Sequence, residues 1–136
     1  GQLNLAIVAV LRGQPLGAAA WLRQVAHIVR ETGSRAAAQS LLEVSSGLAA
    51  LVGDWECSAE FYGAGEAQSE RSQLVRDAAD QAFVNRVVQS MRAALGSAAP
   101  AAEQRGRALD CEEAIERASA WLAASFAEEL DLTPGK

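Results

Sequence analysis

Residues 49–62 read AALVGDWECSAEFY and residues 9–22 read AVLRGQPLGAAAWL, so one arrangement recurs at an offset of forty residues. In each copy a helix-forming run ends at a glycine, Gly13 or Gly53, and a second helix-forming run follows it. A small residue five positions after the glycine lets the two helices approach, and bulky residues further on fill the space to the next hairpin. The repeat therefore predicts two antiparallel helical hairpins that bury each other.

Helix-forming sequence extends from these hairpins towards both ends of the chain. Thirty of the 136 residues are alanine, which loses no side-chain entropy in a helix, whereas β-branched and aromatic residues are few. Apolar residues recur at steps of three and four, and no segment alternates as a strand does. The sequence predicts an all-α fold of about seven helices. These helices span residues 3–12, 16–31, 35–52, 55–67, 78–95, 100–107 and 111–126.

Local signals mark several of the predicted helix starts. Ser34 and Asp54 stand where an N-cap side chain accepts a hydrogen bond from the first turn. Asp110 is followed three residues later by Glu113, the spacing of a capping box. The fourth helix is predicted to fade in the polar run of residues 68–73.

The chain is interpreted as one domain cut from a longer protein. It begins without methionine inside a helical pattern and ends on Thr-Pro-Gly-Lys, where a linker would begin. Residues 1–70 are predicted to form the two hairpins, and residues 71–130 a C-terminal helical unit that completes the same domain. Residues 131–136 are predicted to be a tail or linker.

Three stretches carry a resemblance to a known family: residues 53–67, residues 82–96 and residues 106–122, which contain GDWECSAEFYGAGEA, AALG and GRALD. Together they resemble the tetratricopeptide-like region of large bacterial regulators that join an ATPase module to a LuxR-type or winged helix-turn-helix domain. The resemblance covers residues 3–122 and implies a right-handed tetratricopeptide-like stack of helical hairpins. Because forty residues exceed the ~34 of the standard unit, the repeat is a long variant. The implied role is interaction or signal sensing inside a transcriptional regulator.

The chain departs from that family's pattern at several points. Ser58 and Gly65 stand where such repeats usually carry alanine, which affects packing. The Gly-x-x-x-x-Gly-Lys-Ser/Thr loop is missing, and the final Gly135-Lys136 has neither the first glycine nor a following Ser or Thr. No helix-turn-helix unit follows Leu122. Nucleotide binding and DNA binding are therefore not carried over to this chain.

The composition and charge of the chain limit the kinds of molecule that it is expected to bind. The net charge is -5, with twelve basic against seventeen acidic residues, so we predict no nucleic-acid partner. Residues 3–11 are apolar but shorter than the ~20 residues of a membrane span, so we predict no membrane contact and no targeting signal. Cys57 and Cys111, with one histidine in the chain, are too few for a zinc site. Reduced thiols predict a cytoplasmic protein.

The sequence lacks the residue clusters that catalysis or metal binding needs. The single histidine, His27, lies at the edge of an apolar stripe, with no partner evident in the pattern. Glu112, Glu113 and Glu116 lie at a helix start, where the macrodipole favours acids. We predict no catalytic residue, no cofactor and no metal. A small helical enzyme stays the third alternative, and it requires clustered polar residues on inward faces, of which the predicted stripes contain almost none.

A protein or peptide partner is the remaining expectation, including other domains of the same parent chain; a freestanding scaffold or adaptor is the alternative. Trp21, Trp55 and Tyr62 are candidates for a peptide groove, although such residues are more often core. The small patch 63–65 predicts the close approach of a neighbouring helix rather than a ligand passage.

Self-association is a further expectation. The first helix is apolar on more than one side, so it is expected to be covered in the parent protein and to pair with a second copy when alone. The sequence thus predicts a homodimer, or a weaker concentration-dependent association, through the first two helices. Its contact face would be Leu3, Ile7, Val8 and Leu11.

Overall fold

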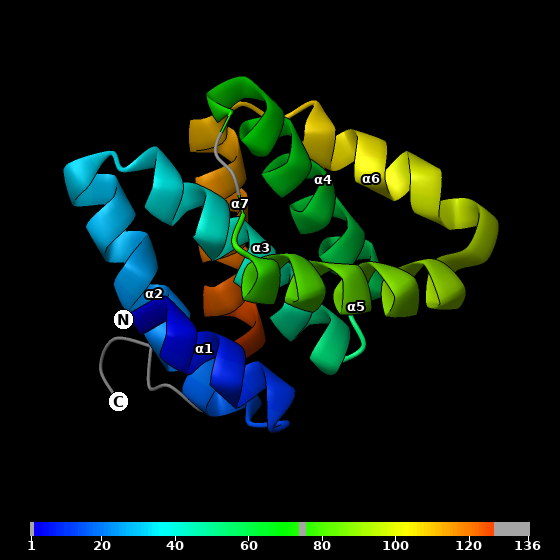
Figure 1. The fold of residues 1–136 in the computed structure, drawn as a ribbon, viewed down its shortest axis with the longest axis horizontal. Coiled ribbons are helices and arrows are strands. Elements are labelled where there is room, and N and C mark those ends of the chain that lie inside the picture. Colours follow the sequence, from blue (N-terminus) through cyan, green and yellow to red (C-terminus); the bar gives the residue numbers. More distant parts are fainter. Residues whose placement is uncertain (1, 74–75, 127–136) are drawn as a thin grey trace.

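The computed structural model describes residues 2–73 and 76–126, with side chains from residue 7 onward. Within these residues every regular element is helical, and no strand is present (Figure 1). The predicted all-α fold with about seven helices is confirmed. The helices are α1 (Gln2–Leu11), α2 (Pro15–Thr32), α3 (Arg35–Leu51), α4 (Trp55–Ser72), α5 (Ala78–Leu95), a 3-10 turn η1 (Gly96–Ala98), α6 (Ala99–Arg107) and α7 (Cys111–Phe126).

The two glycine turns at the offset of forty residues have the same geometry. Gly13 and Gly53 both adopt left-handed backbone, at φ of 68° and 82°. Each glycine N–H donates to the carbonyl three residues earlier, at 3.0 and 3.1 Å. The next residue donates to the carbonyl five residues before it, at 2.8 Å in both turns. These bonds close the ends of α1 and α3, so α1–α2 and α3–α4 are two hairpins with equivalent turns.

Helix α3 lies at the centre of the molecule. It contacts α1, α2, α4, α5 and α7 (Figure 1), and it is buried almost without interruption from Ala38 to Ala49. Because neighbours cover it on every side, its polar residues are buried together with its apolar stripe. A hydrogen-bonded pair results: the Ser46 hydroxyl donates to the Ser58 carbonyl at 2.7 Å, and the Ser58 hydroxyl donates to the Ser46 carbonyl at 2.9 Å. Ser58 therefore joins α4 to α3 through two hydrogen bonds.

Helix α7 returns from the far end of the chain to join both hairpins, since it contacts α2, α3 and α4. Trp121 is buried and meets Phe61 and Phe126 edge to face, with ring centroids 5.6 and 5.8 Å apart. Its indole N–H donates to Asp54 at 2.8 Å. The start of α7 is the predicted capping box, because Asp110 and Glu113 each accept from the other's backbone N–H, at 2.8 and 3.0 Å.

Helix α4 is longer than the sequence predicts. The prediction that it fades after residue 67 is wrong, since it continues to Ser72 and closes at Gln73 in left-handed backbone. The start of the polar run is covered, because α4 packs against both α3 and α6. Gln68, for example, is only 2% exposed. Long-range packing therefore overrides the local signal.

The backbones of α4 and α6 touch at two glycines. A Cβ atom at Gly63 would overlap the carbonyl oxygen of Glu103, and one at Gly106 would overlap the carbonyl oxygen of Glu60. The predicted close approach of a helix is thus confirmed at Gly63. At Gly65 a Cβ atom would instead make an ordinary contact, 3.5 Å from the Cγ atom of Glu43 on α3.

Candidate functional site

The three aromatic candidates do not line one groove. Trp55, at the start of α4, is half-buried and lines a groove that α1, α3 and α5 complete. Tyr62 is half-buried further along α4; its hydroxyl donates to Glu66 at 2.9 Å, and the Arg92 guanidinium lies 5.6 Å from its ring centre. Trp21 is on α2 and packs against the main core. Of the three, only Trp55 lines this groove.

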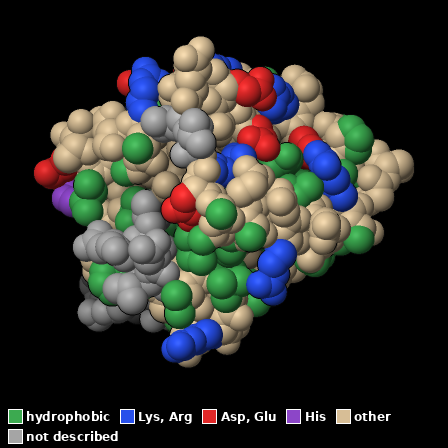
Figure 2. All heavy atoms as spheres, in the orientation of Figure 1, with side chains coloured by type: hydrophobic (Ala, Val, Ile, Leu, Met, Phe, Trp, Pro, Cys, Tyr) green, Lys and Arg blue, Asp and Glu red, His purple; other side chains and the backbone are tan. Residues whose placement is uncertain are grey.

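The groove at Trp55 encloses about 220 Å³ between α1 and α5, with α3 as its base. It forms because α1 and α5 both pack on α3 but have little contact with each other. Figure 2 shows hydrophobic side chains gathered on this face, where Figure 1 places α1 and α5. The lining residues are Val10, Leu11, Gly47, Ala50, Leu51, Trp55, Phe83, Arg86, Val87 and Ser90.

The groove has a fixed base and an exposed rim. At its base the Phe83 ring lies against Gly47, where a Cβ atom would overlap the ring. On the rim Leu11 is 50% and Leu51 39% exposed, and Val52 next to Leu51 is also exposed. Such large exposed hydrophobic side chains, gathered on one face, are typical of contact surfaces. Sequence periodicity had placed these residues on helices but could not show that they meet.

The predicted self-association face is divided between core and surface. Ile7 is half-buried and packs against the core, whereas Val8 is 40% exposed and Leu11 forms the groove rim. The side chain of Leu3 lies outside the described residues. The described side chains of α1, from Ile7 to Leu11, therefore offer an exposed apolar edge.

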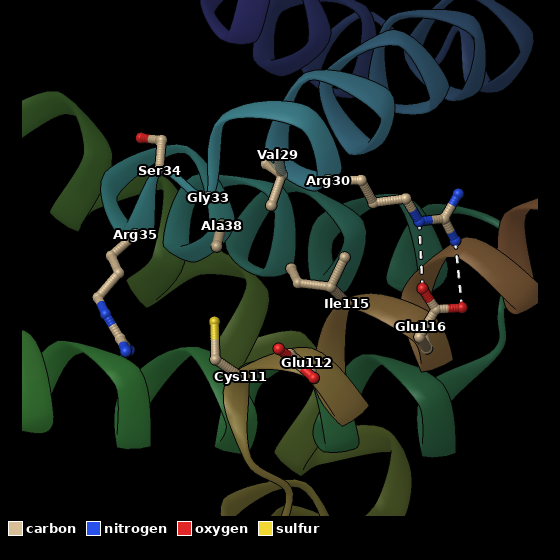
Figure 3. A pocket seen from close by; sticks show the side chains of 10 residues that line it. All are labelled: Val29, Arg30, Gly33, Ser34, Arg35, Ala38, Cys111, Glu112, Ile115 and Glu116. Carbon is tan, nitrogen blue, oxygen red and sulfur yellow. Dashed lines mark hydrogen bonds and ion pairs between the residues drawn. The ribbon is translucent and has the colours of Figure 1, made fainter.

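A second opening, of about 350 Å³, lies where the end of α2 and the start of α3 meet the start of α7 (Figure 3). Cys111 and Ile115 of α7 face it on one side and Val29 of α2 on the other. Arg30 and Glu116 close one edge with two hydrogen bonds of 3.1 and 3.2 Å. The lining contains a thiol but no histidine, so it assembles no thiol–imidazole pair of the kind that activates cysteine.

Buried charge is the largest difference from the sequence prediction. The Arg76 guanidinium, from the connection between α4 and α5, bonds to Glu43 and, at 2.8 Å, to Glu66. The Arg76 and Glu43 side chains are each 9% exposed. Burial raises the pKa of the Glu43 carboxyl, and Arg76 opposes that rise. The expectation that inward faces contain almost no polar residues is wrong, since this ion cluster is inward-facing.

The geometry of this cluster favours a structural role. The Glu43 and Glu66 carboxylates both accept hydrogen bonds from the Arg76 guanidinium. Gln39 donates to Glu43 at 3.2 Å, and Arg76 donates to Gln81 at 3.2 Å. An acid/base catalyst needs a group free to exchange a proton with substrate. The cluster instead ties three segments together: α3 through Glu43, α4 through Glu66 and the α4–α5 connection through Arg76.

Contacts within the fold account for His27, Glu113 and Glu116. His27 is exposed and lies 3.1 Å from Glu31, a partner one helical turn away that the sequence interpretation overlooked. Glu113 belongs to the capping box, and Glu116 pairs with Arg30. Burial raises the pKa of the Cys57 thiol to about 11, so it stays protonated at neutral pH. Among the described residues no group of His, Cys, Asp and Glu is arranged to hold a metal ion.

Comparison of the chain with protein-family models, with curated proteins and with solved structures found no match. None of the helices within residues 2–73 and 76–126 has the length and apolar character to cross a bilayer.

Proposed function

We propose that the chain is a non-catalytic interaction module, and that its binding surface is the groove between α1 and α5. The observation that carries this proposal is the open apolar groove whose rim exposes Leu11 and Leu51. Exposing apolar surface to water is unfavourable, and a partner that covers it gains that free energy. The partner we propose is a protein or peptide, which includes other domains of the same parent chain.

The distribution of polar groups supports binding over catalysis. The two carboxylates of the buried cluster are both paired with Arg76, and the Cys57 thiol is held protonated. His27 is on the exposed side of α2 and lines a different opening from Cys111. A small helical enzyme would need such groups together around one cavity.

The setting we propose is a bacterial transcriptional regulator in the cytoplasm. Its support is the resemblance of residues 3–122 to the tetratricopeptide-like region of ATPase-linked regulators, together with the equivalent turns at Gly13 and Gly53. A freestanding adaptor is the alternative. Sequencing the complete reading frame separates the two, because an ATPase loop upstream or a helix-turn-helix downstream supports the regulator. A frame that contains neither contradicts it.

A second copy of the chain is the other candidate to cover α1. Val8 and Leu11 form a continuous apolar edge on α1, one helical turn apart, which favours this mode of contact. Sedimentation of the wild type against a Val8→Glu and Leu11→Glu double variant tests it, because both side chains are exposed. If the wild type is a dimer and the double variant is a monomer, the second copy is the partner. A wild type that stays monomeric at high micromolar concentration would exclude the second copy.

Peptide display tests the interaction function directly. Peptides selected on the folded chain are expected to lose about tenfold or more in affinity for a Leu51→Glu variant, because a carboxylate on the rim is desolvated when the groove is covered. Leu16→Glu is the matched control: Leu16 is 45% exposed but is not part of the groove. Selection that yields no binder, or binders equally sensitive to both variants, would contradict the proposal.

A further inference from the structure

The charge of the groove lining is opposite in sign to the net charge of the chain. The chain has a net charge of -5, yet among the described residues Arg86 is the only ionisable one that lines the groove. Arg86 is exposed and pairs with no acidic residue in the described part of the chain. Arg12, equally unpaired there, follows Leu11 directly at the end of α1. The groove lining is thus apolar, with one exposed arginine, Arg86.

The size of the groove suits the anchor of a larger partner. Pockets that enclose a whole small molecule usually measure ~300–1,000 Å³, and this one measures about 220 Å³ and is open. It is bounded by two helices that both pack on α3. An amphipathic helix laid between two such helices inserts large side chains from one face and keeps its polar flanks at the rim.

We infer that the groove binds an amphipathic helix of another protein whose apolar face is flanked by Asp and Glu. This inference rests on the proposed interaction function and names the chemistry of the partner. The anchor side chains, leucine or phenylalanine, contact Leu11, Leu51 and Trp55. The carboxylates that flank the anchors meet Arg86, which gives the contact its orientation and its preference among partners.

A second copy fits this groove less well than an acidic helix does. A symmetric contact centred on the groove would bring Arg86 of both copies into one small interface. Like charges that face each other across an interface are unfavourable. The groove lining offers no carboxylate to compensate them.

Two synthetic peptides probe the inference. Both have ~18 residues, about five helical turns, with leucines at i, i+3, i+4 and i+7. One has Glu beside the leucines and the other has Lys at the same positions. Binding is measured by fluorescence anisotropy of the labelled peptides against the folded chain, at low and at high ionic strength.

We expect the Glu peptide to bind about tenfold more tightly than the Lys peptide at low salt, with the difference shrinking as salt screens the charges. Arg86→Glu is expected to reverse the order of the two peptides. Arg23→Glu is the control, because Arg23 is also exposed and unpaired among the described residues but lies on α2, outside the groove. It should leave the order unchanged. Circular dichroism confirms that both variants fold.

Other outcomes overturn the inference. If both peptides bind equally and Leu51→Glu weakens both, the groove is an interaction site without the acidic preference, and the proposed function survives alone. If the free chain is a dimer that Arg86→Glu or Leu51→Glu alters, the second copy is the occupant. If neither peptide binds and display also yields none, the interaction function itself fails.

Discussion

Helices α4 and α6 are in contact through their backbones, whereas α1 and α5 are separated by a groove. The first contact depends on Gly63 and Gly106, where each helix occupies the space of a missing side chain on the other. Ion pairs flank it: Glu60 with Arg105 at 3.5 Å and Glu70 with Arg107 at 2.7 Å. In the second region the Phe83 ring of α5 lies against Gly47 of α3, and the rim of the groove is apolar and exposed.

The difference distinguishes residues that stabilise the fold from residues that are available to bind a partner. A crossing closed by backbone contact leaves no room for another molecule, so its residues are expected to matter for folding. The exposed rim of the groove adds little to folding, because its side chains already contact water on one side. Its residues are expected to matter for binding. Each of the following variants tests one side of this separation.

The largest effect is expected from Gly63→Ala. The new methyl group would overlap the Glu103 carbonyl oxygen, and since backbone cannot rotate away as a side chain can, α6 must move. We expect a loss of more than about 3 kcal/mol in the free energy of unfolding, measured by urea denaturation.

Gly65→Ala is its matched control, two residues along the same helix. Its methyl group would lie 3.5 Å from Glu43 Cγ, an ordinary contact, and alanine gains up to about 1 kcal/mol over glycine in helix propensity. The stability should therefore stay level or rise. Equal losses in both variants would contradict the account of the α4–α6 contact.

The next effect is expected at the buried cluster. Arg76→Met leaves the Glu43 carboxyl buried without its cation, so its folded-state pKa rises further above 4.5. The penalty is present in full above that raised pKa and disappears as the pH falls through it towards 4.5. We expect a loss of about 2–3 kcal/mol at neutral pH that becomes smaller in acid. Thermal unfolding of wild type and variant at several pH values checks this, and a loss independent of pH would contradict it.

Local features of this fold were predictable because their causes are local. Ser34, Asp54 and Asp110 cap the helices that their positions indicate, and each accepts a hydrogen bond from a backbone N–H within three residues. The two glycine turns likewise depend on backbone bonds within five residues. The helices and their number could therefore be predicted from one sequence.

Long-range features were not predictable in the same way. Gly63 indicated a close neighbour, but the sequence does not say that the neighbour is α6 or that Gly106 reciprocates. Arg76 lies in a connection, outside any helical stripe, so periodicity does not place it with Glu43, thirty-three residues earlier. The same holds for the groove, because Leu11, Leu51 and Arg86 come from α1, α3 and α5, and the packing of α1 and α5 on α3 brings them to one opening.

The smallest effect on stability is expected at the groove rim. Leu51→Glu should change the free energy of unfolding by less than about 1 kcal/mol, because Leu51 is already largely hydrated. The Leu16→Glu control should change it as little. A loss at Leu51 comparable to that of Gly63→Ala would make the rim part of the core and remove the distinction between the two regions.

The most direct test of the groove as a binding surface uses the indole N–H signals of the tryptophans. The chain has three: Trp55 in the groove, Trp21 on α2 and Trp121 in the core. Titration of the Glu-flanked peptide into the ¹⁵N-labelled chain, followed by NMR, should move the Trp55 signal in a saturable manner and leave the Trp21 signal in place. Movement of Trp21 with Trp55 unchanged would contradict the account.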